Sequence, residues 1–445
     1  MREFINANET IREDDERTIA AAIELAHEDG CNKVVIPRYN ARTKTTKWSL
    51  PRAVQIPSHT TIILDNCYME QARGSYENLF TSWRSMDVEW CTKPENEVED
   101  IALIGEGNVT LSGGEHNHCL EKTNRNYGLP GMWVQPILMW VNVNGLRMEN
   151  LHLEHQRWWS INHIMCRNVK IKNINFYAIP HVPNLDGIDL RIGCNNFEIE
   201  NITGRTGDDV VAFTALKGRG EVPRMVPGKD THIRDIKVRN IKGDANNCYP
   251  LRLLNHDDNE IYNIEVDTIM DSSDPDSRVR GGAGLSIGSP FYFSQHPAAM
   301  GDTHDIHVKN IYTRCTFGVI MNHVLNDTTI SNVHTFKDNI DGIVSMVDGV
   351  ALDKVVIDGL YCGSDQPLRD DGSPIARENY IGSGIRFPKL NGKLTVKHME
   401  LGPIGKAVSV QGGGTVEIED LKETDTFQSF ERDDESKIIV NGEEK

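Results

Sequence analysis

Apolar and polar residues alternate in short runs along most of the chain, and one early segment has helical spacing. Residues 14–30 carry acidic side chains in the first turn, and Gly30 is a natural stop. The apolar positions of this segment are Ile19, Ala22, Ile23 and Ala26. The runs that follow end at Gly, Asn or Asp and predict strands, namely NKVVIP, TTIILDN, DIALIGEG and NVTLSGG. We therefore expect one helix near the N-terminus and strands after it.

One phrase recurs in the middle of the chain, with an asparagine placed before an apolar residue. It is found in GLRMENLHLE, NVKIKNINFY, NFEIENITGR, HIRDIKVRNIKG and HDIHVKNIYT. The asparagines are Asn150, Asn173, Asn201, Asn240 and Asn310, with successive gaps of 23, 28, 39 and 70 residues. The shortest gaps match a coil of three short strands, and the longer ones hold a coil plus a loop or a less regular turn. The repeat predicts a solenoid whose coils share one core.

The predicted fold is an all-β, single-stranded, right-handed parallel β-helix with an N-terminal capping helix. A β-propeller is the alternative, but its four-stranded units need roughly 40 residues. Because Asn side chains satisfy the backbone groups of turns, the recurring asparagines are expected to form a structural ladder. We expect a single β-helix domain over residues 1–445, with a cap region at 1–40 and an acidic C-terminal tail at 425–445. The repeat continues weakly through KVVIDGLYC, KLTVKHMEL and TVEIEDL.

Composition excludes several classes of partner. The formal charge is −18, with 47 basic against 65 acidic residues, which disfavours nucleic acid and other long polyanions. The chain opens on polar residues and has no run near the roughly 18 apolar residues of a membrane helix, so we expect a cytoplasmic protein without a membrane partner. Nine cysteines without a Cys-x-x-Cys motif predict neither a disulfide framework nor a zinc cluster. We expect no cofactor and no metal, and the oligomeric state stays open.

Two acidic motifs lie about one coil apart. PNLDGIDL, at 183–190, contains Asp186, and GDDV, at 207–210, contains Asp208 and Asp209. Equivalent positions on stacked coils lie about 4.8 Å apart, so Asp186 and Asp208, separated by 22 residues, are expected on one outer face. Crowded carboxylates repel, and at least one pKa is expected to rise. Glycoside hydrolysis uses one carboxylic acid and one carboxylate, although each aspartate taken alone is also a turn-capping residue.

The stretch CRNVKIKNINFYAIPHVPNLDGIDLRIGCNNFEIENITGRTGDDVVAF, residues 166–213, resembles the polygalacturonases of glycoside hydrolase family 28. In that family an Asn-x-Asp-Gly-Ile-Asp motif precedes Gly-Asp-Asp by one coil. The likeness extends to the opening helix, to DIALIGEGNVTLSGG and to GGAGLSIGS at 281–289. It implies that Asp208 is the general acid, and that Asp186 and Asp209 hold and activate the water of an inverting hydrolysis. Asn184 is expected to contact substrate, and Asp189 is expected to have a structural role in a turn.

The chain departs from this family where the family contacts a uronate. The family's Gly-His-Gly before Leu-Ser-Ile-Gly-Ser has lost its histidine, because Ala283 stands there. One coil further, Ile320 and Asn322 replace the Arg-x-Lys pair. Without a guanidinium to grip a carboxylate, affinity for galacturonate should fall. We expect a pectin-related or other plant or bacterial oligosaccharide as substrate, rather than plain polygalacturonate.

Other residues are candidates to compensate for these losses. Arg252 alternates with Leu251 and Leu253, so it is expected to face outward, either towards substrate or in a surface salt bridge. His181 is the preferred replacement for the lost imidazole, and Asn322 is a candidate substrate contact. The other candidate histidines are His256, His296 and His323.

Two further features are candidates to border the cleft. The insertion KGRGEVPRMVPGKD, at 217–230, is expected to form a cleft wall. The seven tryptophans all precede residue 160, and they include Trp133, Trp140, Trp158 and Trp159. They are expected either to stack on sugar rings or to pack in the core.

Two other functions stay open at the level of sequence. A polysaccharide lyase or epimerase on the same fold would need a base near C5 of the sugar, and calcium dependence would distinguish it. A non-catalytic, carbohydrate-binding β-helix would treat Ala283 as the mark of a decayed site. The joint presence of Asp186, Asp208 and Asp209 argues against decay. Fold analogy alone does not decide between these functions.

Overall fold

The computed structural model of the chain divides into two compact units, unit 1 (Met1–Ile233) and unit 2 (Arg234–Lys445), which are described separately. The residues that the structure describes are 2–115, 117, 136–179, 182–218, 220–256, 258–274, 280–288, 298–336, 341–347, 349–363 and 373–445. Within these residues no helix is long and apolar enough to cross a membrane. The expectation of a single domain over the whole chain stays a prediction.

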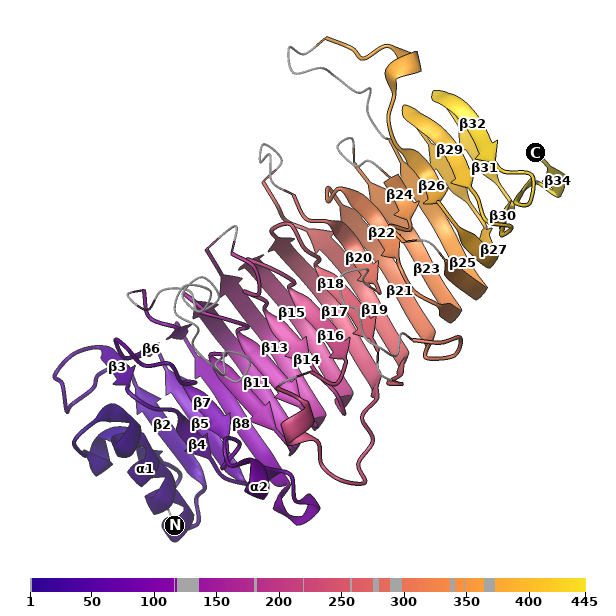
Figure 1. The fold of residues 1–445 in the computed structure, drawn as a ribbon. Coiled ribbons are helices and arrows are strands. Elements are labelled where there is room, and N and C mark those ends of the chain that lie inside the picture. Colours follow the sequence, from indigo (N-terminus) through magenta and orange to yellow (C-terminus); the bar gives the residue numbers. More distant parts are fainter. Residues whose placement is uncertain are drawn as a thin grey trace. The chain divides into compact units, whose positions relative to one another are not determined.

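The first elements of unit 1 form its N-terminal cap (Figure 1). They are β1 (Ile5–Asn6), η1 (Ala7–Thr10), α1 (Asp15–Asp29) and β2 (Lys33–Pro37). Asp14 caps α1 by accepting the Arg17 N–H at 2.8 Å, and Gly30 ends it with a left-handed φ of 76°. The four apolar side chains of the predicted helical face are all buried. The predicted helix is therefore confirmed.

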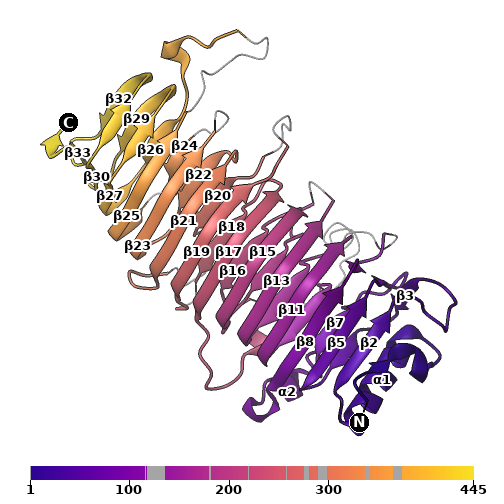
Figure 2. The ribbon, with the colours of Figure 1, turned by 180° about the vertical axis from the view of Figure 1, so that it is seen from behind.

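Unit 1 contains two sheets whose strands pair in parallel with the strand one coil further along. The long-strand sheet holds β1, β2, β3 (Lys47–Leu50), β5 (Thr60–Asp65), β6 (Tyr68–Gln71), β8 (Val98–Glu106), β9 (Thr110–Ser112), β11 (Val143–Glu154), β13 (Arg167–Tyr177) and β15 (Asn195–Thr206). The short-strand sheet holds β4 (Val54–Ile56), β7 (Phe80–Ser82), β10 (Leu138–Val141), β12 (Ile161–Ile164), β14 (Ile188–Leu190) and β16 (Val211–Ala215). Figure 2 shows β2, β5, β8, β11 and β13 side by side. Connecting segments form α2 (Val88–Cys91), η2 (Pro94–Asn96) and η4 (Val222–Arg224).

Unit 2 repeats this arrangement. Its long-strand sheet holds β17 (Ile233–Ala245), β19 (Ile261–Asp271), β21 (Thr303–Thr313), β23 (Leu325–Thr335), β25 (Val350–Cys362), β27 (Leu390–Val396), β28 (Met399–Leu401), β30 (Thr415–Ile418), β31 (Leu421–Glu423) and β33 (Lys437–Val440). Its short-strand sheet holds β18 (Leu251–Asn255), β20 (Ala283–Ile287), β22 (Phe317–Met321), β24 (Asp341–Val344), β26 (Ser383–Phe387), β29 (Ile404–Val410) and β32 (Thr426–Arg432). A short helix, η5 (Arg377–Asn379), precedes β26. Each unit is thus built of stacked coils with parallel pairing between them, and the predicted right-handed parallel β-helix is confirmed.

The recurring asparagines mark the bend within each long strand. Asn150, Asn173 and Asn201 have left-handed φ values of 59°, 56° and 57°. The amide of Asn173 donates to the Asn150 side-chain oxygen at 2.8 Å, and Asn201 donates to Asn173 at 3.0 Å. In unit 2 the Asn332 amide donates to Asn310 at 3.1 Å. Asparagine tolerates the left-handed region, and its amide extends the hydrogen bonding of the sheet from coil to coil. The predicted ladder is confirmed.

The short strands share a local shape that fixes where the site residues point. In β14, Gly187 and Ile188 both face the core, so Asp186 and Asp189 occupy two outer positions three residues apart. A Cβ atom at Gly187 would lie 2.4 Å from the Val210 carbonyl oxygen and 2.8 Å from the Phe176 ring, which leaves room for glycine alone. The same position in unit 2 is taken by Gly284, Gly318, Gly342 and Gly384. The short-strand sheet therefore presents two rows of side chains on its outer face, which we call the outer positions.

The acidic C-terminal segment 425–445 is not a frayed tail, which corrects the prediction. Strand β32 pairs in parallel with β29, and β33 pairs in parallel with β30. The last strand, β34 (Glu443–Glu444), pairs antiparallel with β33 and ends the long-strand sheet. Buried apolar side chains such as Ile438 continue the core into this coil, so the segment is held by packing despite its acidic composition.

Candidate active site

The two aspartate motifs lie on adjacent strands of the short-strand sheet in unit 1. Ile188 of β14 is paired with Val211 of β16, which is an offset of 23 residues. The Gly187 N–H donates to the Asp209 carbonyl oxygen at 2.9 Å, so the same offset places Asp186 opposite Asp209. The register thus differs by one residue from the 22-residue coil expected from the sequence, which set Asp186 against Asp208. The structure brings all three carboxylates onto one face.

The three carboxylates differ in their access to solvent. Asp186 and Asp209 are 2% and 0% exposed, whereas Asp208 is only half-buried. One carboxylate oxygen of Asp208 accepts the Asn184 N–H at 2.7 Å, and the other accepts the Asp209 N–H at 3.1 Å. Asn184 has a left-handed φ of 60°, which aims its N–H at Asp208. Asn184 therefore positions Asp208 through its backbone, and the substrate contact expected of its side chain stays a prediction.

A tryptophan occupies the outer position on the preceding coil. Ile161 of β12 is paired with Ile188, and the Ser160 N–H donates to the Asp186 carbonyl oxygen at 2.9 Å, so Trp159 lies opposite Asp186. Trp159 is 7% exposed, and its ring centroid is 5.6 Å from that of Trp158. Trp140 is fully buried, as core packing predicts. Trp133 lies outside the described residues.

A buried charged triad borders the aspartates and was missed by the sequence analysis. The Arg191 guanidinium lies 3.6 Å from a carboxylate oxygen of Asp189 and donates to Glu221 at 2.6 Å. Its central carbon lies 4.5 Å from the Trp159 ring centroid. The side chains of this triad are at most 7% exposed. Asp189 lies within strand β14 and beside a cation, so the turn role expected of it is wrong.

The insertion at 217–230 supplies Glu221 to this triad. Glu221 and Arg224 are 2% and 6% exposed, so this segment packs against the unit instead of extending into solvent. Lys229 donates to the Asn142 side chain at 2.8 Å and also pairs with Glu97. Residue 219 lies outside the described residues. The insertion thus covers part of unit 1 beside the aspartates, and its role as a cleft wall stays a prediction.

Unit 2 carries Arg252. Leu251 and Leu253 are fully buried, and Arg252 is paired with Ser286 at the next outer position, which confirms the alternation predicted from the sequence. The Arg252 side chain is nevertheless covered, since the residue is only 7% exposed. Arg252 is therefore not the exposed surface cation of the alternative interpretation, and its contact with substrate stays a prediction.

The positions that depart from the polygalacturonase pattern form an apolar cluster in unit 2. Ala283, Ile320 and Val344 are buried against one another, with Tyr249 and Phe317 packed beside them. They occupy outer positions of β20, β22 and β24. The lost histidine and the first lost cation are thus replaced by packed hydrocarbon.

Asn322 follows β22 and is held by the backbone of the next coil. Its side-chain oxygen accepts the Met346 N–H at 2.7 Å, and the residue is 8% exposed. Because this oxygen already has a partner, a substrate hydroxyl would have to share it or use the amide N–H groups. The proposed substrate contact of Asn322 stays a prediction.

The candidate histidines have different outcomes. His181 and His296 lie outside the described residues. His256 and His323 lie in unit 2 with ring centroids 5.5 Å apart in an edge-to-face arrangement, and both are buried. Burial, with His256 nearby, lowers the pKa of His323 to about 4. A neutral His323 imidazole at neutral pH does not replace a cation.

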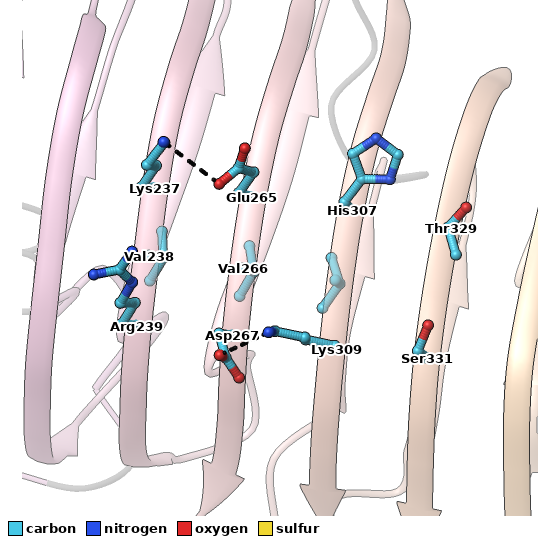
Figure 3. A pocket seen from close by; sticks show the side chains of 11 residues that line it. Lys237, Val238, Arg239, Glu265, Val266, Asp267, His307, Lys309, Thr329 and Ser331 are labelled. Carbon is cyan, nitrogen blue, oxygen red and sulfur yellow. Dashed lines mark ion pairs between the residues drawn. The ribbon is translucent and has the colours of Figure 1, made fainter.

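A shallow groove on the long-strand sheet of unit 2 is a second concave feature (Figure 3). It has a volume of about 420 Å³ and is crossed by two ion pairs. Lys237 lies 3.7 Å from Glu265, and Lys309 lies 3.0 Å from Asp267. These charges already have partners on the neighbouring strand, and surface pairs of this kind are common on sheets. The aspartate cluster of unit 1 is the better candidate for catalysis.

Comparison with known proteins supports the likeness carried by the motifs. No family model matches the chain. Among curated proteins, the chain is 29% identical over 110 residues to polygalacturonase QRT2 from Arabidopsis thaliana. The match covers 25% of this chain and 25% of that relative. The chain thus resembles a polygalacturonase over a quarter of that protein's length, and the activity of the whole protein is a matter for proposal.

Solved structures share the fold at low sequence identity. The tailspike protein of E. coli bacteriophage HK620, solved as a double mutant, has a TM-score of 0.55 at 10% identity, over 99% of this chain and 79% of that chain. The A-module of the mannuronan C-5 epimerase AlgE6 from Azotobacter vinelandii gives 0.54 at 11% identity, over 98% of both chains. The surface adhesin PfbA of Streptococcus pneumoniae gives 0.53 at 12% identity, over 96% and 93%. These likenesses establish the β-helix fold and no activity.

Proposed function

We propose that this protein is a glycoside hydrolase that cleaves an oligosaccharide with inversion at the anomeric carbon. The observation that carries the proposal is the placement of Asp186 opposite Asp209 on neighbouring strands, with the more exposed Asp208 beside them. The sequence likeness to a polygalacturonase supports the same class. A cluster of carboxylates that differ in burial suits a reaction that needs one protonated and one ionised carboxyl group.

In the proposed reaction, Asp208 donates a proton to the glycosidic oxygen as the bond from that oxygen to the anomeric carbon breaks. Asp186 and Asp209 hold a water molecule on the opposite face of the sugar and take up its proton as it attacks. Inversion requires space for this water, so acid and base should lie about 6.5 to 9.5 Å apart with substrate bound. The proton taken up by the base is then lost to solvent, and Asp208 regains one.

The hydrogen bonds of Asp208 fit a positioned acid. The Asn184 and Asp209 N–H groups hold its two carboxylate oxygens at 2.7 and 3.1 Å. An oxygen that carries the proton is a weaker acceptor, so one of these bonds should loosen when Asp208 is protonated. The half-buried position leaves this carboxyl accessible to a leaving oxygen, whereas Asp186 and Asp209 are covered. This difference assigns the acid role to Asp208.

We further propose that the substrate is neutral or of mixed composition and is cleaved better than polygalacturonate. The outer positions at which the resemblance expects uronate contacts hold Ala283 and Ile320, which pack in an apolar cluster. Each lost charge-assisted contact is worth about 1.5 to 3 kcal/mol. The formal charge of −18 further disfavours a long polyanion. We therefore expect a higher kcat/KM for neutral oligosaccharides than for polygalacturonate.

A panel of neutral, mixed and acidic oligosaccharides, assayed for new reducing ends, tests the proposed activity. Asp208→Asn should lower turnover of any substrate found by about 10² or more, because general acid catalysis contributes 10² to 10⁴. Asp434→Asn is a matched control, since Asp434 is exposed in the C-terminal coil. Equal turnover by Asp208→Asn and wild type, with equal Tm, would remove Asp208 from the mechanism. A kcat/KM that is highest for polygalacturonate would contradict the proposed substrate class.

A further inference from the structure

A pocket of about 440 Å³ lies within unit 2, over the outer positions of β24, β26, β29 and β32. Polar side chains from four successive coils line it, and none of them belongs to the aspartate cluster of unit 1. They include Asp341, Arg386, Lys406, Ser409, Gln428 and Glu431. The size is within the 300 to 1,000 Å³ that is typical of small-molecule sites.

A buried carboxylate fixes one wall of this pocket. Asp341 is 1% exposed, and one of its oxygens accepts the Ser383 N–H at 2.8 Å. Its other oxygen accepts from Nε and Nη2 of Arg386 at 3.0 and 2.8 Å. The guanidinium plane is therefore held in one orientation, while the Arg386 side chain stays 34% exposed. A guanidinium has five N–H donors, so Arg386 retains donors for a ligand.

The facing wall presents a second fixed carboxylate. Lys406 and Ser409 both donate to Oε2 of Glu431, each at 2.6 Å. These two donors lower the pKa of Glu431, which is therefore ionised at neutral pH. Oε1 of Glu431 has no hydrogen-bond partner among the described residues, and the side chain is 38% exposed. A charged acceptor is thus held in place with one oxygen available.

An exposed aromatic ring completes the pocket. Phe427 lines it from β32 and is 51% exposed, which is unusual for a large apolar side chain beside polar groups. Paired charges that served only to hold the coils together would not require an exposed phenyl ring next to them. An exposed ring beside fixed donors and acceptors matches the chemistry of a sugar, which has an apolar C–H face and a rim of hydroxyl groups.

We propose that this pocket binds one neutral sugar residue of a carbohydrate chain. The Phe427 ring stacks on the C–H face of the sugar, and neighbouring hydroxyl groups bond to Glu431 and Arg386. The lining charges favour a neutral sugar over a uronate, because three carboxylates face two cations. The acids are Asp341, Glu378 and Glu431, and the cations are Arg386 and Lys406. The proposal does not require hydrolysis in unit 1.

Binding by the full-length chain carrying Asp208→Asn, which limits turnover, tests the proposal. The probes are xylotetraose, cellotetraose and β-1,4-galactotetraose, with tetragalacturonate as the acidic comparison, and binding is followed by calorimetry and saturation-transfer NMR. Adding Phe427→Ala should weaken binding of the preferred neutral probe by about 3- to 10-fold, the range expected for one aromatic contact. Glu431→Gln, which keeps the side-chain size, should weaken it as well. Phe4→Ala, which removes a ring that is 39% exposed in unit 1, should leave the Kd unchanged.

An unchanged Kd for every neutral probe with both pocket variants would overturn the proposal, as would binding of tetragalacturonate alone. Hydrolysis is measured separately on the chain with Asp208 intact. A protein that binds through Phe427 but cleaves nothing would contradict the proposed activity and leave the pocket standing. A protein that cleaves oligosaccharides but binds equally well without Phe427 would do the reverse.

Discussion

Asp186 and Asp209 lie opposite each other on adjacent short strands of unit 1, at an offset of 23 residues. This register makes them the pair that shares one water molecule, while Asp208 stands beside the pair. Residues that act as a unit give non-additive losses when they are substituted. Asp186→Asn and Asp209→Asn should each lower kcat by about 10² or more, and the double variant should lose little more than either alone. Losses that multiply in the double-mutant cycle would contradict a shared role.

The buried triad around Arg191 predicts a large effect on stability. Arg191→Met would leave the carboxylates of Asp189 and Glu221 without their cation, and breaking a buried pair in this way costs about 3 to 5 kcal/mol. Urea denaturation should report this loss in the free energy of unfolding. Arg147→Met is the control, because Arg147 pairs with Glu149 at an exposed site and should change stability by less than about 1 kcal/mol. A similar small change for both variants would show that Arg191 is not essential to the packing.

The asparagine ladder predicts separable contributions from backbone and side chain at Asn173. Asn173→Ala places a Cβ without a compensating amide at a φ of 56° and removes two ladder hydrogen bonds, at a cost of about 2 to 4 kcal/mol. Asn173→Gly keeps the left-handed backbone without strain and loses the amide bonds, so it should cost about half as much. Asn391→Ala, at an exposed position of β27, should stay within about 0.5 kcal/mol of wild type. Unfolding free energies in urea that are equal for Asn173→Ala and Asn391→Ala would refute the ladder's contribution.

The buried His163 of β12 predicts a loss of stability at acidic pH. Burial lowers its pKa from 6.5 to about 4, and its Nδ1–H donates to the Asp189 carbonyl oxygen at 3.0 Å. The unfolded chain binds this proton at higher pH than the folded chain does. The stability contributed by neutral His163 is therefore complete above pH 6.5 and is lost as the pH falls towards 4, by on the order of 3 kcal/mol.

Comparison of unfolding free energies at pH 7 and pH 4.5 checks this prediction. His163→Gln keeps a donor at this position but removes the titrating ring, so it should show a smaller loss on acidification than wild type. His307→Gln, at an exposed position of β21, should retain the loss seen in wild type. The same decrease for wild type and His163→Gln would exclude His163 as its source.

The fold was predictable because its signals are local and repeated. The asparagine phrase recurs once per coil, and each copy marks the same left-handed bend, so the sequence spacing reports the stacking directly. The helix α1 was also predictable, since its cap, its buried face and its stop are adjacent in the chain. The C-terminal coil was mistaken for a tail because its acidic residues outnumber the few buried side chains, such as Ile438, that hold it.

The candidate site was predictable in part. The two motifs gave the shared face, but the exact pairing depends on a 23-residue offset that spacing alone placed one residue away. Arg191 was missed because its partner Glu221 lies 30 residues further along, in an insertion without a repeat. The Asp-Gly-Ile letters do not identify the site by themselves, since Asp341, Gly342 and Ile343 repeat them in unit 2 and Asp341 binds Arg386 there. The glycine reflects the crowded inner position of each short strand, and the Gly-Asp-Asp motif one coil later distinguishes the candidate site.

The anomeric configuration of the first product tests the central claim most directly. Proton NMR spectra recorded during cleavage of the best substrate, before the new reducing end equilibrates, reveal which anomer forms first. The arrangement of Asp186, Asp208 and Asp209 predicts the anomer opposite to that of the cleaved bond, with signals that disappear when Asp208→Asn replaces the wild type. Formation of the same anomer, or of an unsaturated sugar at the new non-reducing end, would contradict an inverting hydrolysis by these aspartates.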